Sequence, residues 1–349
     1  MSRRALITGV TGQDGSFMAE LLLSKGYTVY GLTRRTGGAE SGARWTECLG
    51  DLSDGSRLTE LLQETRPEEV YHFGAQSDSQ ASFAVPEYTT EITGLSTLRL
   101  LEAIRRVDPG IRFYQASSGE IFGEAPPPQH EGSPMNPRTP YAVAKLYAYH
   151  LARIYRESHG LFCCSGILFN HESPRRDERH VTRKITRGIA RILAGEQAAI
   201  ILGDLRARRD WGYAPECVEA AWSLLQCEAP DDVVIGTGED HAVAEFLDVA
   251  FGYAGLRQER HVRTDPRHLR ANDAWVLRAD CSKARRLLGW KPKLSFEELV
   301  KVLMDAELQR AGLEVPGEGM EAARRAGLEW SLAGLCGPVT TGAAGKGAA

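Results

Sequence analysis

Short apolar runs alternate with longer helical patterns through the first half of the chain. Six runs are strand-like: Arg4–Thr8, Tyr27–Leu32, Thr46–Gly50, Glu69–Phe73, Arg112–Ala116 and Leu161–Phe169. Helical patterns lie between them, at Ser16–Lys25, where apolar residues form one face, and at about residues 86–106. Strands that alternate with helices indicate βαβ units, whose right-handed crossovers bring the strand carboxyl ends to one edge of a parallel sheet. The pattern predicts an α/β fold of Rossmann type with a doubly wound parallel sheet.

The alternation of strand-like runs and helical patterns becomes less regular beyond about residue 170. Arg and Asp are dense between Glu172 and Asp210, which suits loops that line an anionic ligand, and Gly203–Tyr213 has the turn chemistry of a connecting loop. We expect a smaller C-terminal α/β lobe that binds the substrate. The residues from Gly334 to Ala349 are of low complexity, which is typical of a disordered tail.

A glycine loop follows the first predicted strand and leads directly into the first predicted helix. Its candidate cofactor-binding residues are Gly9, Val10, Thr11, Gly12, Gln13, Asp14 and Gly15. The three glycines permit a tight turn, close approach of a pyrophosphate and close helix–strand packing, and the helix N-terminus offers N–H groups to phosphate. The spacing is one residue wider than the usual fingerprint, and a purely structural turn is the alternative. The position between strand and helix favours dinucleotide binding.

Two arginines, Arg34 and Arg35, follow the second predicted strand, where a cofactor with a free ribose 2′-hydroxyl is usually met by a carboxylate. Arginine pairs bidentately with phosphate, so this pair favours NADP over NAD, with two solvated surface arginines as the alternative. Asp51 and Leu52 directly follow the next strand-like segment, where they could contact the edge of the adenine.

Tyr141 and Lys145 lie in a helical pattern that follows Pro137 and Pro140. Residues four apart share a helix face, so both side chains can point at one ligand. Proton transfer near pH 7 needs roughly 4 kcal/mol of phenolate stabilisation, which Lys145 and a positive nicotinamide ring together can supply. The pair predicts oxidation of a hydroxyl group on a small polar substrate.

Ser118 and Glu120 follow a strand about twenty residues upstream of the tyrosine. A serine at the strand end can hydrogen-bond both the substrate hydroxyl and the phenol. Simple alcohol oxidation needs no further carboxylate, whereas proton removal next to a newly formed carbonyl does. Glu120 therefore indicates an elimination, with a solvated loop residue as the alternative.

Composition narrows the possible classes of protein. The 349 residues carry a net charge of −4, so we expect no nucleic-acid partner. No apolar run approaches the roughly 18 residues that span a bilayer, so we expect no membrane partner. The apolar stretch after the basic N-terminus is too short for a signal peptide, which predicts a cytoplasmic protein. Seven scattered cysteines without a Cys-x-x-Cys pair are typical of reduced structural thiols, and we expect no metal site.

Longer stretches resemble the GDP-mannose 4,6-dehydratase family of the extended short-chain dehydrogenase/reductase (SDR) superfamily. The resemblance covers about residues 3–310 and is most specific at Leu6–Gly15, Arg112–Ser118, Pro140–Tyr149 and Gly166–Arg176. The sequence Asn-His-Glu-Ser-Pro in the last stretch is more diagnostic than the glycine loop, which all relatives share. The resemblance implies a lyase that dehydrates a GDP-sugar to a 4-keto-6-deoxy sugar.

The resemblance also implies a role for each catalytic residue. Tyr141 takes the proton of the sugar 4-hydroxyl while hydride passes from C4 to NADP, and Lys145 holds the cofactor ribose and lowers the tyrosine pKa. Glu120 removes the C5 proton and helps to expel the C6 hydroxyl as water, and Ser118 orients the 4-hydroxyl. Hydride then returns to C6, so NADP stays tightly bound and is recycled in each turnover.

Ligand contacts follow from the same resemblance. For NADP it implies, besides the glycine loop and Lys145, the residues Asp51, Leu52, Phe73, Gly74, Ala75, Gln76, Ser77, Tyr88, His171 and Arg176. For the GDP-sugar it implies Ser82, Asn170, Lys184, Arg209 and Arg270. We therefore expect an NADP-binding core in residues 1–170, to which later segments return. A lobe in residues 171–315 would mainly bind the nucleotide sugar, and residues 316–349 would form a partly disordered tail.

Three departures from the family pattern concern the substrate and the assembly. Asp78 and Asp273 stand where other residues are usual in the sugar site. Thr36-Gly37-Gly38 replaces a serine pair in a loop that reaches a neighbouring subunit in relatives, so both a homodimer and a homotetramer stay possible. GDP-mannose is the leading substrate, and GDP-manno-heptose is the close alternative. A nucleotide-sugar 4-epimerase or 4-ketoreductase and a non-catalytic NADP-sensing scaffold are the more distant ones.

Overall fold

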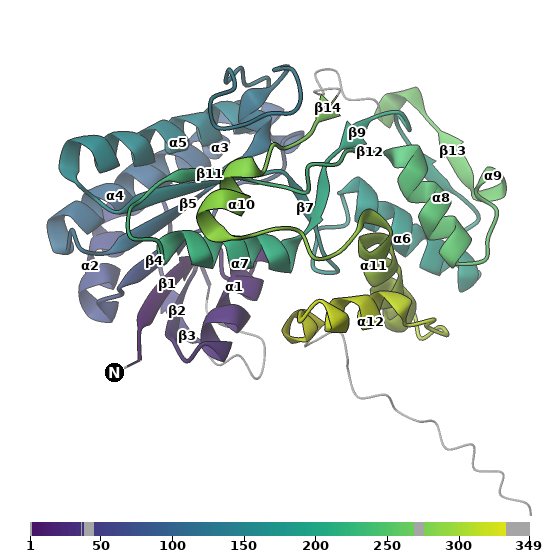
Figure 1. The fold of residues 1–349 in the computed structure, drawn as a ribbon, viewed down its shortest axis with the longest axis horizontal. Coiled ribbons are helices and arrows are strands. Elements are labelled where there is room, and N and C mark those ends of the chain that lie inside the picture. Colours follow the sequence, from purple (N-terminus) through teal and green to yellow (C-terminus); the bar gives the residue numbers. More distant parts are fainter. Residues whose placement is uncertain (1, 36, 38–44, 269–275, 333–349) are drawn as a thin grey trace, which may run out of the picture.

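A computed structural model describes residues 2–35, 37, 45–268 and 276–332. Seven parallel strands form one sheet in the order β11-β6-β5-β4-β1-β2-β3 (Figure 1). They are β1 (Arg4–Thr8), β2 (Thr28–Thr33), β3 (Thr46–Leu49), β4 (Glu69–His72), β5 (Arg112–Ser118), β6 (Cys163–Leu168) and β11 (Asp232–Ile235). The strand order reverses between β1 and β4, so the predicted doubly wound sheet is confirmed, as are the six strands predicted from the sequence.

Helices cover both faces of this sheet (Figure 1). α1 (Gln13–Ser24) and α7 (Ala214–Leu225) pack together on one face, where Phe17 and Leu224 join the same apolar cluster. On the other face lie α2 (Gly55–Thr65), α4 (Ser96–Val107) and α5 (Pro140–His159). The predicted helical stretch before residue 107 comprises α3 (Pro86–Thr89), a π-helical turn η2 (Thr90–Leu95) and α4. No helix within the described ranges has both the length and the apolar character needed to cross a bilayer.

A smaller lobe has its own apolar cluster, which includes side chains from β8, β10 and four helices. The helices are α6 (Val181–Leu193), α8 (Val243–Tyr253), α11 (Phe296–Arg310) and α12 (Glu318–Arg325). Short strands pair around it: β7 (Asn170–Glu172) with β10 (Trp211–Tyr213), β8 (Ile200–Leu202) with β13 (Val262–Thr264), and β9 (Arg208–Arg209) with β12 (His241–Ala242) and β14 (Val276–Leu277). The other helical segments are η1 (Ala81–Phe83), η3 (Gly119–Phe122), α9 (Gln258–His261), η4 (Pro266–His268), α10 (Ser282–Leu288) and η5 (Glu329–Leu332).

The structure differs from the sequence-based expectation in two places. The segment expected to be a loop, Gly203–Tyr213, contains the strands β9 and β10. The sequence predicts a tail that begins at residue 316, but Met320, Leu328 and Leu332 are buried in the apolar cluster of the smaller lobe, so the lobe extends at least to residue 332. Both errors have the same cause: strands of two or three residues and a single short helix are too short for their hydrophobic period to be recognised. Residues 333–349 lie outside the described part of the chain.

Helix α5 is held firmly at both ends. Thr139 is its N-cap and accepts a hydrogen bond from the backbone N–H of Ala142 at 3.0 Å. Near the other end, Arg156 donates two hydrogen bonds to the carboxylate of Asp232 in β11, at 3.0 and 2.6 Å. Asp232 also accepts from the backbone N–H of Ser165 in β6, so this buried carboxylate ties the helix to the sheet edge.

Replacing Asp232 by alanine should destabilise the fold by about 3–5 kcal/mol, because it leaves the Arg156 guanidinium half-buried without its anion. The shift of the urea unfolding midpoint measures this loss. The matched control is Glu157→Ala, which removes an exposed ion pair with Arg153 from the same helix and should barely move the midpoint. Equal shifts for the two variants would contradict the anchoring role.

Candidate active site

The glycine loop connects β1 to α1 at the point where the strand order reverses. Gly9 has a positive φ of 72°, and a Cβ there would lie 2.7 Å from the backbone nitrogen of Gly74, which follows β4. A Cβ at Gly15 would lie 2.2 Å from the carbonyl oxygen of Gly9. Gly12 is the N-cap of α1 and supplies no side-chain cap, so the first N–H groups of the helix are left for a ligand. The loop therefore suits a pyrophosphate, because its backbone makes the required tight turn and its N–H groups can donate hydrogen bonds to the phosphates.

The other predicted cofactor residues line the same edge. Arg34 donates to the Tyr88 hydroxyl at 3.0 Å, which brings a residue found after β2 together with one from α3. The Leu52 side chain packs against the Cα of Gly74, and the backbone N–H of Gln76 donates to Thr93 at 3.1 Å. Asp51 accepts from Ser53, which lowers the pKa of its carboxyl. Arg35 is exposed. The segment Phe73–Ser77 follows β4 directly and lies beside the glycine loop.

The segment from Asn170 to Arg176 is hydrogen-bonded to the start of α1. His171 shares a 3.0 Å hydrogen bond with the Asp14 carboxylate, and its other ring nitrogen lies 2.7 Å from the Phe169 carbonyl oxygen. Ser173 donates to the Gln13 amide oxygen at 2.7 Å, and Arg175 donates to Ser16 at 2.9 Å. Because both imidazole nitrogens are occupied by protein partners, His171 acts here on the glycine loop through Asp14.

The Asp14–His171 pair is largely shielded from solvent, and each group shifts the pKa of the other. Burial would raise the pKa of Asp14, but the imidazole outweighs it and lowers the pKa to about 2. Burial would likewise lower the pKa of His171, but the Asp14 carboxylate raises it above the ordinary value. Arg176 opposes the proton on His171 and favours the charge on Asp14, so its guanidinium also acts on this pair.

The four predicted catalytic residues come together at the ends of β5 and α5. Ser118 is the last residue of β5, accepts from the Glu120 backbone N–H at 3.2 Å and hydrogen-bonds Tyr141. Tyr141 and Lys145 are both buried on α5, and the ammonium nitrogen of Lys145 lies 5.8 Å from the phenol ring centre. That ammonium donates to the Ala116 carbonyl oxygen at 2.7 Å, so β5 positions the lysine as well as the serine and the glutamate.

The pKa of Tyr141 departs in the opposite direction from the one expected. Burial raises the pKa of this phenol and the Glu120 carboxylate raises it further, while the Ser118 hydrogen bond and the Arg176 charge lower it. Burial also lowers the pKa of Lys145 to about 8. The sequence-based expectation counted the attraction of Lys145 and of a bound nicotinamide ring. It left out the desolvation of the phenol and the lysine, which is the largest cause for both groups in the protein without cofactor.

Four of the five predicted substrate residues lie in the described part of the chain, on separate elements. Ser82 is buried in η1, Asn170 begins β7, Lys184 lies in α6 and Arg209 is buried in β9. Arg270 lies outside the described residues, as does Asp273. Next to Arg209, the buried Asp210 accepts four hydrogen bonds: two from Thr237, one from Gly238 and one from Ala279. Sequence reasoning missed Asp210, whose only signal was its place in the Arg-Asp-Trp-Gly stretch.

A family profile described as GDP-mannose 4,6 dehydratase matches residues 6–303. GDP-mannose 4,6 dehydratase 1 of Arabidopsis thaliana is 48% identical over 328 residues, which cover 89% of this chain and 91% of that protein. The human GDP-mannose 4,6 dehydratase is 41% identical over 339 residues, covering 87% of this chain and 91% of that protein. The chain belongs to the GDP-mannose 4,6-dehydratase family.

Solved structures extend the likeness to other SDR enzymes. The Thermotoga maritima UDP-glucose 4-epimerase with UDP-glucose matches with a TM-score of 0.79 at 26% identity, covering 89% of this chain and all 100% of that one. The Thermus thermophilus UDP-glucose 4-epimerase, a complex with NAD, matches with a TM-score of 0.75 at 29% identity, covering 86% and 98%. The fold is thus common to enzymes of different reactions, and only the site residues distinguish them.

Asp78, one departure from the pattern of the family, has two partners. Its carboxylate accepts from the backbone N–H of Ala81 at 3.0 Å and forms an ion pair with Arg179 at 3.1 Å. Arg179 belongs to the segment between β7 and α6, so the pair connects the loop after β4 with the smaller lobe. Of the altered loop at residues 36–38, only Gly37 is described, and its N–H donates to Glu47.

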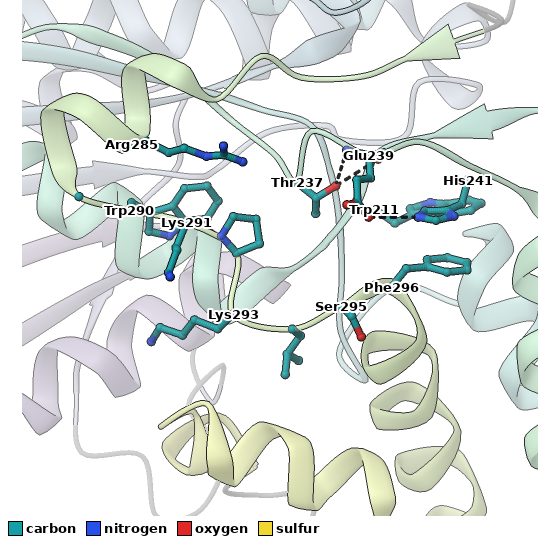
Figure 2. A pocket seen from close by; sticks show the side chains of 13 residues that line it. Trp211, Thr237, Glu239, His241, Arg285, Trp290, Lys291, Lys293, Ser295 and Phe296 are labelled. Carbon is teal, nitrogen blue, oxygen red and sulfur yellow. Dashed lines mark hydrogen bonds and ion pairs between the residues drawn. The ribbon is translucent and has the colours of Figure 1, made fainter.

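A cavity of about 580 Å³ lies apart from the predicted site (Figure 2). Trp290 lies on one side of the cavity and Phe296 on the other, stacked on His241 with ring centres 3.8 Å apart (Figure 2); Pro292 also lines the cavity. The remaining lining residues are Trp211, Thr237, Glu239, Arg285, Gly289, Lys291, Lys293, Leu294 and Ser295. None of the predicted catalytic, cofactor or substrate residues lines this cavity, so it is separate from the predicted site.

The contribution of His171 to stability should depend on pH. Its pKa is raised in the folded protein, so the stabilisation is fully present below the unfolded value of about 6.5 and is lost as the pH rises through the folded value. Urea midpoints of the wild type and His171→Gln should therefore differ most near pH 6 and converge above the folded pKa. His130→Gln, at an exposed site, is the control and should show no such convergence. A difference that grows with pH would refute the charged pair.

Proposed function

We propose that this chain is a hydro-lyase that converts GDP-mannose to GDP-4-keto-6-deoxymannose with NADP as cofactor. One observation carries the proposal: the Glu120 carboxylate lies close enough to the buried Tyr141 for its charge to raise the pKa of the phenol. Glu120, which can remove a proton from carbon, therefore lies near Tyr141, which can remove the proton of a hydroxyl group. Membership of the dehydratase family supports the same reaction.

The proposed chemistry assigns one proton to each residue. Tyr141 takes the 4-hydroxyl proton, with Ser118 holding the oxygen in place. Bound NADP would supply a hydride acceptor for C4 and a hydride donor for C6, and its positive charge would lower the pKa of Tyr141. Glu120 removes the C5 proton and passes it to the C6 hydroxyl, which leaves as water while the C5–H electrons form a C5–C6 double bond. Once hydride is back at C6, C5 takes up the proton that Tyr141 holds, so both residues return to their starting state. No net oxidation results, so the cofactor is expected to stay bound between turnovers.

A nicotinamide dinucleotide suits the residues present. The N–H groups at the start of α1 and the close backbone approach at Gly9 and Gly12 would hold the pyrophosphate. Arg34 and Arg35 would hold a ribose 2′-phosphate, which is the ground for proposing NADP, and Asp51 and Leu52 would meet the adenine. The solved relative at 29% identity is a complex with NAD, which supports binding of a nicotinamide dinucleotide. The preference for NADP over NAD rests on the two arginines alone.

Epimerisation at C4 is the nearest competing reaction, since the solved relatives at 26% and 29% identity are UDP-glucose 4-epimerases. That reaction breaks no C5–H bond and needs no Glu120. We further propose a cytoplasmic homo-oligomer, either a dimer or a tetramer, on the grounds of composition and of the resemblance.

The decisive test is the product formed from GDP-mannose. The wild type should yield a 4-keto-6-deoxy sugar nucleotide detectable by mass and NMR, while Glu120→Gln should retain NADP but lose about a thousandfold in turnover, because it lacks the base. Most of the wild-type rate in Glu120→Gln would show that the base is misassigned. If GDP-mannose gives no product while GDP-manno-heptose does, the reaction holds and the substrate is wrong.

Cofactor choice should depend on the arginines after β2. Arg34→Ala should weaken NADP binding by about tenfold or more, through loss of a charged hydrogen bond to the phosphate, and leave NAD binding nearly unchanged. Titration of nucleotide-free protein with each cofactor measures this. Arg105→Ala, an exposed arginine of α4, is the control. Equal losses for NADP and NAD would count against a 2′-phosphate contact.

A further inference from the structure

The Glu120 carboxylate is held by two hydroxyl groups that the assigned machinery does not include. Ser79 donates to Glu120 Oε2 at 2.7 Å, and Thr139 lies 3.5 Å from the same oxygen. The two hydroxyl oxygens are 3.2 Å apart, so both can act on one carboxylate oxygen. Three elements meet here: the loop after β4, the end of β5 and the start of α5.

Each hydroxyl is fixed by its own segment of chain. Thr139 is the N-cap of α5 and accepts from Ala142 at 3.0 Å, so its oxygen moves only with the helix that carries Tyr141. Ser79 lies in a turn closed by two bonds: Ser82 donates to the Ser79 carbonyl at 2.5 Å, and Ala81 donates to Asp78 at 3.0 Å. The backbone positions that carry the two hydroxyl groups are therefore fixed by contacts other than those with Glu120.

A serine hydroxyl has a single proton to donate. The contact with the carboxylate oxygen is shorter than the contact with Thr139, and charge-assisted hydrogen bonds are the stronger ones, so the Ser79 proton points at Glu120. Thr139 already accepts from the helix backbone, and its own proton points at the same carboxylate oxygen at 3.5 Å. Both hydroxyl groups can therefore donate to Glu120, with the shorter contact from Ser79.

We propose that Ser79 is a positioning residue for the C5 deprotonation, which, together with Thr139, fixes the Glu120 carboxylate relative to Tyr141. The inference rests on the proposed function, because it assumes that Glu120 is the base. Ser79 would bind neither NADP nor the C4 hydroxyl. Its loss should therefore slow the elimination and leave substrate binding and C4 oxidation intact.

The test compares Ser79→Ala with Ser79→Thr, which keeps the hydroxyl, and with the control Thr90→Ala, which removes an exposed hydroxyl bonded to the Pro86 carbonyl. Ser79→Ala should lower kcat about tenfold, as expected for one hydrogen bond to a charged group, with KM and bound cofactor unchanged. In the same variant, the deuterium isotope effect from C5-labelled substrate should rise and that from C4-labelled substrate should fall. Ser79→Thr should restore most of the rate, and Thr90→Ala should match the wild type.

Unchanged isotope effects in a folded Ser79→Ala protein would overturn the inference, as would a loss expressed in KM alone. If Ser79→Ala fails to fold, Ser79→Thr decides the question through the same isotope effects, which should then equal those of the wild type. The proposed function fails separately: in that case the wild type itself forms no 4-keto-6-deoxy product and shows no isotope effect at C5.

Discussion

Parallel strands that end at one edge of the sheet bring every proposed reacting group to the same place. β1 delivers the glycine loop, β4 delivers the loop with Ser79, and β5 delivers Ser118 and Glu120. The strand order reverses between β1 and β4, which separates the helices on the two faces and leaves space for a ligand between the loops. Gly9 has no Cβ, which lets the loops after β1 and β4 approach each other closely at this edge.

Burial at this edge imposes an electrostatic cost that the fold offsets locally. The Asp14 carboxylate lies 3.0 Å from the His171 imidazole and raises its pKa, and Lys145 directs its ammonium at a carbonyl oxygen. A Tyr141 phenolate is compensated less well, since burial and Glu120 raise the pKa by more than the Ser118 hydrogen bond and the Arg176 charge lower it. A tyrosine that gives up its proton readily only when a positive ligand is present would remain inert without it, which suits a reaction that must begin with hydride removal.

The same fold serves UDP-glucose 4-epimerases, so the fold alone does not set the reaction. Oxidation at C4 is the common first step of both chemistries, so Tyr141 and Lys145 cannot separate them. A carboxylate beside the tyrosine, fixed by hydroxyl groups from two other elements, creates a route that the epimerases do not need. The further reaction would then depend on how well this one carboxylate is held.

The sequence by itself determined the alternation of strands and helices, the glycine loop and the grouping of Ser118, Glu120, Tyr141 and Lys145, because local period and strand order place these residues at one edge. The sequence did not predict short strands such as β9, the helix α12, or the contacts of Ser79 and Asp210. All of these depend on partners that are distant in the chain. Tertiary structure alone decided the direction of the Tyr141 pKa. Desolvation and the distance to Glu120 exist only once the chain is packed, and no residue pattern records them.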